Sequence, residues 1–338
     1  MIITRTPFRV SFFGGGTDYP AWYNQHGGAV LSMAINRYCY LTVRHLPPFF
    51  EHKHRVVYSK VELVDHAEQI QHPVVRAIML QQNIESGLEI HHDADLPARS
   101  GMGSSSSFTV GFLKAIYALQ GKMISNRTLA AEAINIEQNV LKENVGSQDQ
   151  LAAAWGGFNH IEFEKGGDYS VNPVILSADR YQELESSIIL FFTGIQRFAS
   201  NVAGKKIANF DKRQDELTTM HGMVNEALSI LNDQNQPIEN FGTLLNESWK
   251  LKRSLSDAVT NPLIDEIYAE AIAAGASGGK LMGAGAGGFM VFIVHPSLRR
   301  KVCERLSRLI HVDCAIDHGG SQVVAYDPER QSAVNCGV

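Results

Sequence analysis

Residues 95–108 read DLPARSGMGSSSSF, a stretch that sets two glycines and four consecutive serines after a proline. Beyond it, apolar residues recur at the spacing of one helix face; they are Phe108, Phe112, Ala115, Ile116 and Leu119. The pattern predicts a glycine-rich loop that leads directly into an amphipathic helix. Because the N–H groups at a helix N-terminus are unpaired and carry the positive end of the helix dipole, this arrangement favours a phosphate-binding loop over a flexible linker.

The composition limits the class of protein. The chain has 338 residues, of which 44% are hydrophobic and 19% are charged, as expected for a globular protein with two domains. We predict one domain over residues 1–184 and a second over residues 185–338. The formal net charge of -5 supplies no basic field, so we expect neither nucleic acid nor a membrane surface as a partner.

The cysteines and the N-terminus indicate the compartment. The four cysteines have no C-x-x-C spacing; they are Cys39, Cys303, Cys314 and Cys336. This pattern indicates neither a zinc site nor a disulfide framework. No basic region followed by a long apolar stretch opens the chain, and it contains no run of about 18 apolar residues. We therefore expect a cytoplasmic protein, and the sequence leaves its oligomeric state open.

Apolar periodicity predicts an α+β fold. Short runs rich in Val, Ile, Phe and Tyr in the N-terminal half are typical of strands, and residues 128–141 have a helical pattern. The next helix is expected at Ser147, which has the spacing of a capping box with Gln150. Further on, we expect helices that begin at Pro262 and Pro296, and strands over FMVFIV and SQVVAYD.

Two other glycine clusters lie at residues 14–16 and 278–289. The later one contains G-x-G-x-x-G at Gly283, Gly285 and Gly288. A dinucleotide-binding fingerprint follows a strand and opens a helix, whereas here we expect a helix and a loop before the glycines and a strand after them. The sequence therefore disfavours a nicotinamide-dependent oxidoreductase.

Two acidic residues are candidates to complete a phosphoryl-transfer site. Glu137 and Asp149 lie 149 - 137 = 12 residues apart. Magnesium prefers hard oxygen ligands, so one hydroxyl, one carboxylate and the phosphates of a nucleotide would suffice to hold it. A carboxylate beside an attacking hydroxyl can accept its proton, and a cation can stabilise the transferred group. Taken alone, a carboxylate on a helix usually lies on a solvated face, and an Asp in a first helical turn usually complements the helix dipole.

Three motifs, in this order, resemble those of a known family. They are TPFRVSFFGGGTDY (residues 6–19), LPARSGMGSSSS (residues 96–107) and KLMGAGAGGF (residues 280–289). With them the chain resembles the GHMP small-molecule kinases, a superfamily named for galactokinase, homoserine kinase, mevalonate kinase and phosphomevalonate kinase. The resemblance implies a two-domain α+β fold with a ribosomal protein S5 domain 2-like N-terminal domain and a ferredoxin-like C-terminal domain.

The same resemblance implies roles for individual residues. Asp149 becomes the catalytic base, and Arg9 the cation beside it. Glu137 and Ser105 become magnesium ligands, so the expected cofactors are ATP and Mg2+. The residues expected to bind the nucleotide phosphates are Pro97, Gly101, Gly103, Ser104, Ser105, Ser106 and Ser107. A non-catalytic sugar or nucleotide sensor of this fold is disfavoured, because such a protein usually loses one of the two acidic residues.

The first motif narrows the substrate. Galactokinases carry G-E-H-T-D-Y, whereas this chain has GGGTDY and lacks the Glu and His that would contact galactose. With GGAVLSMAINRY and FTGIQRFAS, it resembles the D-glycero-D-manno-heptose 7-phosphate kinases, which phosphorylate the anomeric hydroxyl to give heptose 1,7-bisphosphate for nucleotide-heptose synthesis. L-Fucokinases and other sugar-1-kinases are the alternative. The substrate contacts implied are Gly16, Thr17, Asp18, Gly283, Gly285 and Arg197.

A phosphate already on the sugar would need basic groups remote from ATP. Arg197, which follows the TG turn, is the first candidate. The other basic candidates are Lys205, Lys206, Arg37 and Arg44.

Overall fold

The computed structural model describes residues 1–195 and 199–327. Within these residues the strands form one sheet of eight strands and one of four. The larger sheet contains β1 (Ile2–Phe13), β2 (Gly28–His45), β3 (His54–Val57), β4 (Val61–Val64), β5 (Leu88–Ala94), β6 (Phe158–Phe163), β7 (Tyr169–Pro173) and β12 (Gln322–Tyr326). The smaller sheet contains β8 (Ile188–Phe192), β9 (Ala276–Leu281), β10 (Phe289–Val294) and β11 (Ile310–Val312).

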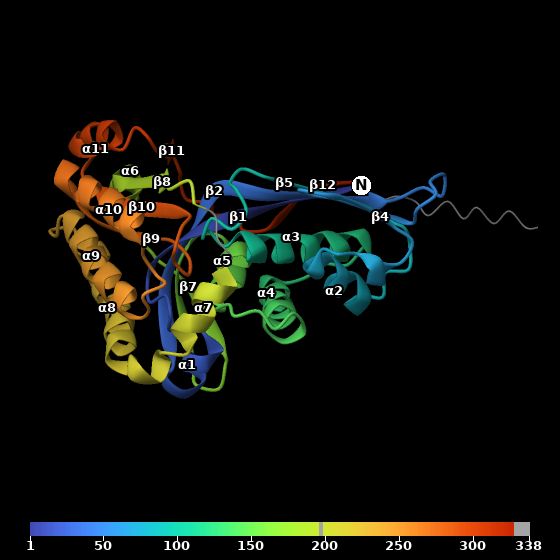
Figure 1. The fold of residues 1–338 in the computed structure, drawn as a ribbon, viewed down its shortest axis with the longest axis horizontal. Coiled ribbons are helices and arrows are strands. Elements are labelled where there is room, and N and C mark those ends of the chain that lie inside the picture. Colours follow the sequence, from blue (N-terminus) through green and yellow to red (C-terminus); the bar gives the residue numbers. More distant parts are fainter. Residues whose placement is uncertain (196–198, 328–338) are drawn as a thin grey trace, which may run out of the picture.

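The order of strands places β1 and β2 at the centre of the larger sheet. Its path is β12-β1-β2-β5-β3-β4, with β6 paired to β2 and β7 to β6, while the smaller sheet has the order β11-β8-β10-β9. Figure 1 shows the larger sheet extending to the right and the smaller one at the upper left. The mixture of helices and sheets confirms the predicted α+β class.

Helices cover both sheets. They are α1 (Pro20–His26), η1 (Ala67–Gln69), α2 (Pro73–Gln81), α3 (Ser104–Leu119), α4 (Asn126–Asn135), η2 (Ile136–Val140), α5 (Gln148–Trp155), α6 (Ala178–Ser187), α7 (Ala199–Ile207), η3 (Phe210–Lys212), α8 (Gln214–Asn232), α9 (Glu239–Ser254), α10 (Pro262–Ala274), η4 (Pro296–Leu298) and α11 (Arg299–Arg305). In the described part of the chain, no helix combines the length and apolar character needed to cross a membrane.

Two contacts fix the elements that carry the site. Helix α3 packs against β1 and β2, and its side chains Phe112 and Ile116 are fully buried there. At the end of β1, the rings of Phe12 and Phe13 meet the ring of Phe241 edge-on, with centroids 5.3 Å and 5.1 Å away. Since Phe241 belongs to α9, the first glycine cluster starts from a strand end that is packed against the C-terminal helices.

Three local expectations need correction. The predicted helix over residues 128–141 is divided into α4 and the π-helical turn η2, where Leu141 N–H donates to the Ile136 carbonyl. The helix expected from Pro296 is a 3-10 turn followed by the short helix α11. The helix expected before Gly283, Gly285 and Gly288 is present as α10, but the loop expected after it is strand β9, so these glycines connect the antiparallel strands β9 and β10.

The division into residues 1–184 and 185–338 remains a prediction. The two sheets change over between β7 and β8, close to that boundary. Strand β12, however, pairs antiparallel with β1 in the larger sheet. The chain therefore passes from one sheet to the other and back again.

Candidate active site

The serine-rich stretch forms the loop-to-helix junction that the sequence predicts, and we call residues 96–107 the phosphate loop after their predicted role. Gly103 precedes α3 with a φ of 79°, and Ser107 N–H donates to the Gly103 carbonyl at 2.9 Å. The N–H groups of the preceding helical residues have no carbonyl of the same helix to bind. Ser105 is exposed at this end, whereas Ser107 is buried and donates its hydroxyl to the Pro7 carbonyl of β1.

The third glycine cluster packs directly against this loop. A Cβ atom on Gly101 would lie 2.7 Å from the Met282 carbonyl oxygen, and one on Gly283 would lie 2.6 Å from the Gly101 Cα. Phe289 N–H also donates to the Ser100 carbonyl at 3.0 Å. The two backbones therefore touch, and the geometry gives Gly283 a packing role against the phosphate loop. A contact of Gly283 or Gly285 with substrate remains a prediction.

Arg9 and Asp149 form a bidentate ion pair beside the phosphate loop. Nε and Nη2 of Arg9 donate to the two carboxylate oxygens of Asp149 at 2.8 Å and 2.9 Å, and Nη1 donates to the Gly101 carbonyl at 2.6 Å. Arg9 comes from β1 and Asp149 from the first turn of α5. Burial raises the pKa of Asp149 above its ordinary value, while the Arg9 guanidinium opposes this rise. The pair orients a partly buried carboxylate toward the helix N-terminus that starts at Gly103.

Glu137 lies fully buried beneath the same helix end. Its carboxylate accepts hydrogen bonds from the Ser106 hydroxyl at 2.8 Å, from the Thr109 hydroxyl at 2.7 Å and from the Gln150 side-chain amide. Burial raises the pKa of Glu137 to about 7, and the two hydroxyl hydrogen bonds act in the opposite direction. Burial disfavours the charged form of this carboxylate, and a bound cation would offset that cost. The oxygen-rich donor set therefore fits a hard divalent ion.

Gln150 explains why the predicted capping box is absent. Its side chain turns toward Glu137, and Ser147 makes no side-chain cap. The Ser147 hydroxyl instead binds Tyr23 and Gln138. Tertiary partners inside the protein therefore replace the local cap.

The first glycine cluster is folded around Asp18. One carboxylate oxygen of Asp18 accepts from Gly16 N–H and the other from the Gln148 side-chain amide, both at 2.8 Å. Thr17 is buried and its hydroxyl binds the Gly14 and Ala29 carbonyls. Asp18 is thus held close to the α5 turn that carries Asp149. That Gly16, Thr17 and Asp18 contact substrate remains a prediction.

The remaining candidates are dispersed. Pro97 is half-buried in the phosphate loop. Arg197, the first candidate for a substrate phosphate, lies outside the described residues. Arg44 pairs with Glu89 on neighbouring strands, and Arg37 donates to the carbonyls of Asn36 and Asp313. These pairings make Arg37 and Arg44 parts of the sheet surface.

Two buried lysines that the sequence analysis did not single out brace the site. Lys252 of α9 donates to the carbonyls of Leu281 and Gly283, both at 2.7 Å, and Lys280 of β9 donates to the Phe12 carbonyl at 2.8 Å. Burial lowers the pKa of Lys252, and it lowers that of Lys280 to about 7. Both ammonium groups tie the third glycine cluster to its neighbours. Lys280 is the first residue of the third motif, but no pattern in the sequence relates it to Lys252, so only the fold brings them together.

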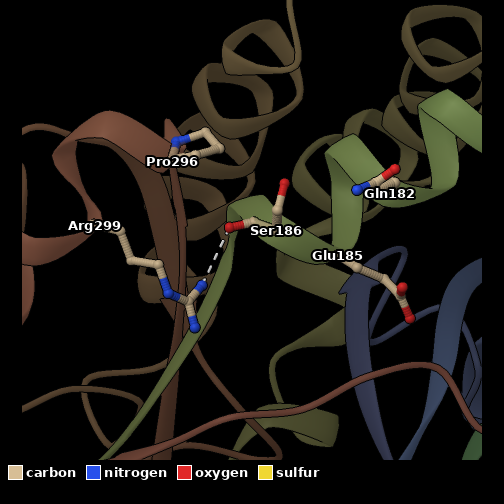
Figure 2. Close-up of a pocket in the computed structure, with 5 residues that line it drawn as sticks. All are labelled: Gln182, Glu185, Ser186, Pro296 and Arg299. Carbon is tan, nitrogen blue, oxygen red and sulfur yellow. Dashed lines mark hydrogen bonds between the residues drawn. The ribbon is translucent and has the colours of Figure 1, made fainter.

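A surface pocket lies elsewhere, between α6 and the segment that opens α11. It encloses about 380 Å³ and is lined by Gln182, Glu185, Ser186, Pro296 and Arg299. Figure 2 shows Arg299 reaching the backbone carbonyl of Ser186, a contact of 3.2 Å. Glu185 likewise accepts from the Ile316 N–H. Through Arg299 and Glu185, these contacts tie α6 to α11 and to the segment around Ile316.

The raised pKa of Glu137 makes a prediction about stability. A carboxyl group with a raised pKa in the folded state stabilises the fold below its ordinary pKa, and this contribution is lost as the pH rises through about 7. In metal-free protein, Glu137→Gln should match the wild type near pH 4, below the ordinary pKa of 4.5, and be more stable near pH 8, by on the order of 3 kcal/mol at about 1.4 kcal/mol per pKa unit. Urea denaturation at both pH values measures the difference, and an equal difference at both would contradict the assignment.

Two family descriptions match parts of this chain. The family description "GHMP kinases N terminal domain" matches residues 68–157, and "GHMP kinases C terminal" matches residues 225–311. The first match contains the phosphate loop, Glu137 and Asp149, and the second contains the third glycine cluster.

Individual relatives span most of the chain. A D-glycero-alpha-D-manno-heptose 7-phosphate kinase from Campylobacter jejuni is 30% identical over 322 residues, which cover 91% of this chain and 93% of the relative. A bifunctional fucokinase/GDP-fucose pyrophosphorylase from Arabidopsis thaliana is 26% identical over 87% of this chain, but this covers only 30% of that relative.

Solved structures agree on the fold. The crystal structure of a D-glycero-D-manno-heptose 1-phosphate kinase from Bacteroides thetaiotaomicron has a TM-score of 0.78 and 24% identity, covering 95% of this chain and 98% of the other. Two matching domain descriptions, a full-length relative and a common fold lead to one conclusion: this chain belongs to the GHMP kinase family.

Proposed function

We propose that this protein is an ATP-dependent sugar kinase that phosphorylates the anomeric hydroxyl of D-glycero-D-manno-heptose 7-phosphate and forms heptose 1,7-bisphosphate for nucleotide-heptose synthesis. The observation that carries the proposal is the Arg9–Asp149 pair, which lies against the phosphate loop through the Gly101 carbonyl. The choice of sugar is supported by the 30% identical relative of nearly equal length. We place the enzyme in the cytoplasm, acting on small molecules.

GHMP kinases use ATP as a substrate, generally with Mg2+. In our proposal the residues from Gly101 to Ser107 bind the nucleotide phosphates through their N–H groups and hydroxyls. Glu137 and Ser105 would hold the magnesium ion, and Ser106 supports the Glu137 carboxylate through its hydroxyl. When bound, the ion supplies charge neutralisation of the β- and γ-phosphates.

The protein's own groups act on the acceptor hydroxyl. Asp149 accepts its proton, and Arg9 holds the carboxylate in one orientation while it stabilises the charge on the transferred group. Asp18 orients the sugar hydroxyls so that the anomeric one lies in line with the γ-phosphoryl group. Because the transition state of phosphoryl transfer is loose, this alignment contributes to the reaction rate in addition to proton transfer.

A coupled ADP-release assay tests the substrate. The acceptors are heptose 7-phosphate, free heptoses, L-fucose, galactose and mannose derivatives. We expect the highest kcat/KM with heptose 7-phosphate, and phosphorus NMR of the product should place the new phosphate on the anomeric carbon. Turnover of L-fucose without turnover of the heptose phosphate would instead establish the fucokinase alternative, which two fucokinase relatives favour.

A further inference from the structure

Lys206 on α7 is a buried lysine without a conventional partner. Only 3% of its surface is exposed, and its Nζ lies 4.5 Å from the centroid of the Tyr19 ring. Within the part of the chain that the structure describes, its ammonium has neither a hydrogen bond nor an ion pair. Burial of most of this charged side chain costs free energy that no hydrogen bond or ion pair among the described residues offsets, so its presence calls for an explanation.

The surroundings of Lys206 are those of the candidate active site. The carboxylates of Asp18 and Asp149 act on it electrostatically and favour its charged form against the effect of burial. Both carboxylates already have other partners, since Asp149 binds Arg9 and Asp18 binds Gly16 and Gln148. Lys206 therefore adds positive charge near Asp18 and Asp149 without forming an ion pair with either.

The other buried cations there are committed to fixed contacts. Arg9 binds Asp149 and the Gly101 carbonyl, while Lys252 and Lys280 bind backbone carbonyls. Among the described cations of this cluster, Lys206 keeps its three N–H donors available. An anionic oxygen that entered the site would find these donors unoccupied.

We infer that Lys206 donates to a phosphoryl oxygen when substrates are bound. The inference rests on the proposed kinase function and deepens it. Two groups of the same chemistry are possible sources of this oxygen: the γ-phosphoryl group in transfer, or the phosphate that the sugar already carries. Contact with the first makes Lys206 a catalytic residue, and contact with the second makes it a specificity residue for phosphorylated sugars.

The test compares Lys206→Met with Lys212→Met, because Lys212 is an exposed lysine in η3, which follows the same helix, and has no proposed contact with substrate. Calorimetry measures binding of a non-hydrolysable ATP analogue with magnesium and of heptose 7-phosphate, and the ADP-release assay measures kcat. If Lys206 binds the sugar phosphate, Lys206→Met should weaken the binding of heptose 7-phosphate at least about 10-fold and leave the binding of the free heptose unchanged. If it binds the transferred group, kcat should fall at least about 10-fold with both KM values nearly unchanged.

Thermal unfolding without ligands separates this role from a structural one. Since Met fills a similar volume and removes a charge that has no hydrogen bond or ion pair in the described part of the chain, Lys206→Met should unfold at the same temperature as the wild type or higher. A lower unfolding temperature together with unchanged binding and kcat would overturn the inference. Lys206→Arg, which keeps the charge, should restore part of the lost binding or turnover.

The design also separates this inference from the proposed function. If the wild type turns over none of the sugars, the proposed function fails. Binding of inorganic phosphate, and of ADP with aluminium fluoride as a mimic of the transferred group, to the wild type and to Lys206→Met still decides the role of Lys206. Equal affinities of the two proteins for both probes would then overturn it.

Discussion

Replacing Asp149 by Asn is expected to lower kcat by about 10²–10⁴-fold, the usual range for loss of a general base. The amide cannot accept the proton, and it can accept only one of the two hydrogen bonds that Arg9 donates at 2.8 Å and 2.9 Å. Arg9 would also face the N–H donors of the new amide. Affinity for ATP should change little, because the phosphate loop and Glu137 keep their own contacts.

Steady-state kinetics and nucleotide binding together measure this effect. Asp168→Asn is the matched control, since Asp168 also pairs with an arginine, Arg127, but on the exposed surface. The control should keep wild-type kcat because exposed ion pairs contribute little. Near-normal turnover in Asp149→Asn would remove Asp149 as the base.

Gly283→Ala should have the second large effect, on both stability and nucleotide binding. Gly283 has a φ of 65°, and an added Cβ would lie 2.6 Å from the Gly101 Cα. We expect a loss of about 2–5 kcal/mol in the free energy of unfolding, from backbone strain together with overpacking. Because the clash falls on backbone atoms of the phosphate loop, the variant should also bind ATP more weakly.

Gly121→Ala provides the comparison for Gly283→Ala. Gly121 has a similar φ of 69°, but no atom lies within 4 Å of an added Cβ. Its substitution therefore measures backbone strain alone, about 1–3 kcal/mol. Urea denaturation of both variants isolates the packing contribution, and equal losses would show that the contact between the two glycine loops is unimportant.

The sequence allowed the local parts of the site to be predicted. The loop and helix around Gly103 follow from a contiguous pattern of glycine, serine and apolar spacing. The pairing of Arg9 with Asp149, which are 140 residues apart, needed the family resemblance, because no local rule relates them. Where partners come from the fold, local reasoning failed: Gln150 turns to Glu137 instead of closing a capping box.

The lysines illustrate the same limit. Lys252 and Lys280 come from a helix and a strand, and each reaches a backbone carbonyl in a different segment. Every residue has a backbone carbonyl, so the sequence does not indicate which carbonyl will accept a hydrogen bond from a lysine. Lys206 stood in the sequence only as one of several basic candidates, and its burial beside Tyr19 sets it apart.

The return of β12 to the larger sheet limits how the enzyme can open. The chain joins the two sheets at β7–β8 and again between β11 and β12, which pairs with β1. Two bodies joined by a single linker can swing about it as a hinge, but a second connection restricts rotation to axes that pass near both. Admission of the sugar and release of the product are therefore limited to rotation about such an axis, to shear between packed layers or to the movement of short loops.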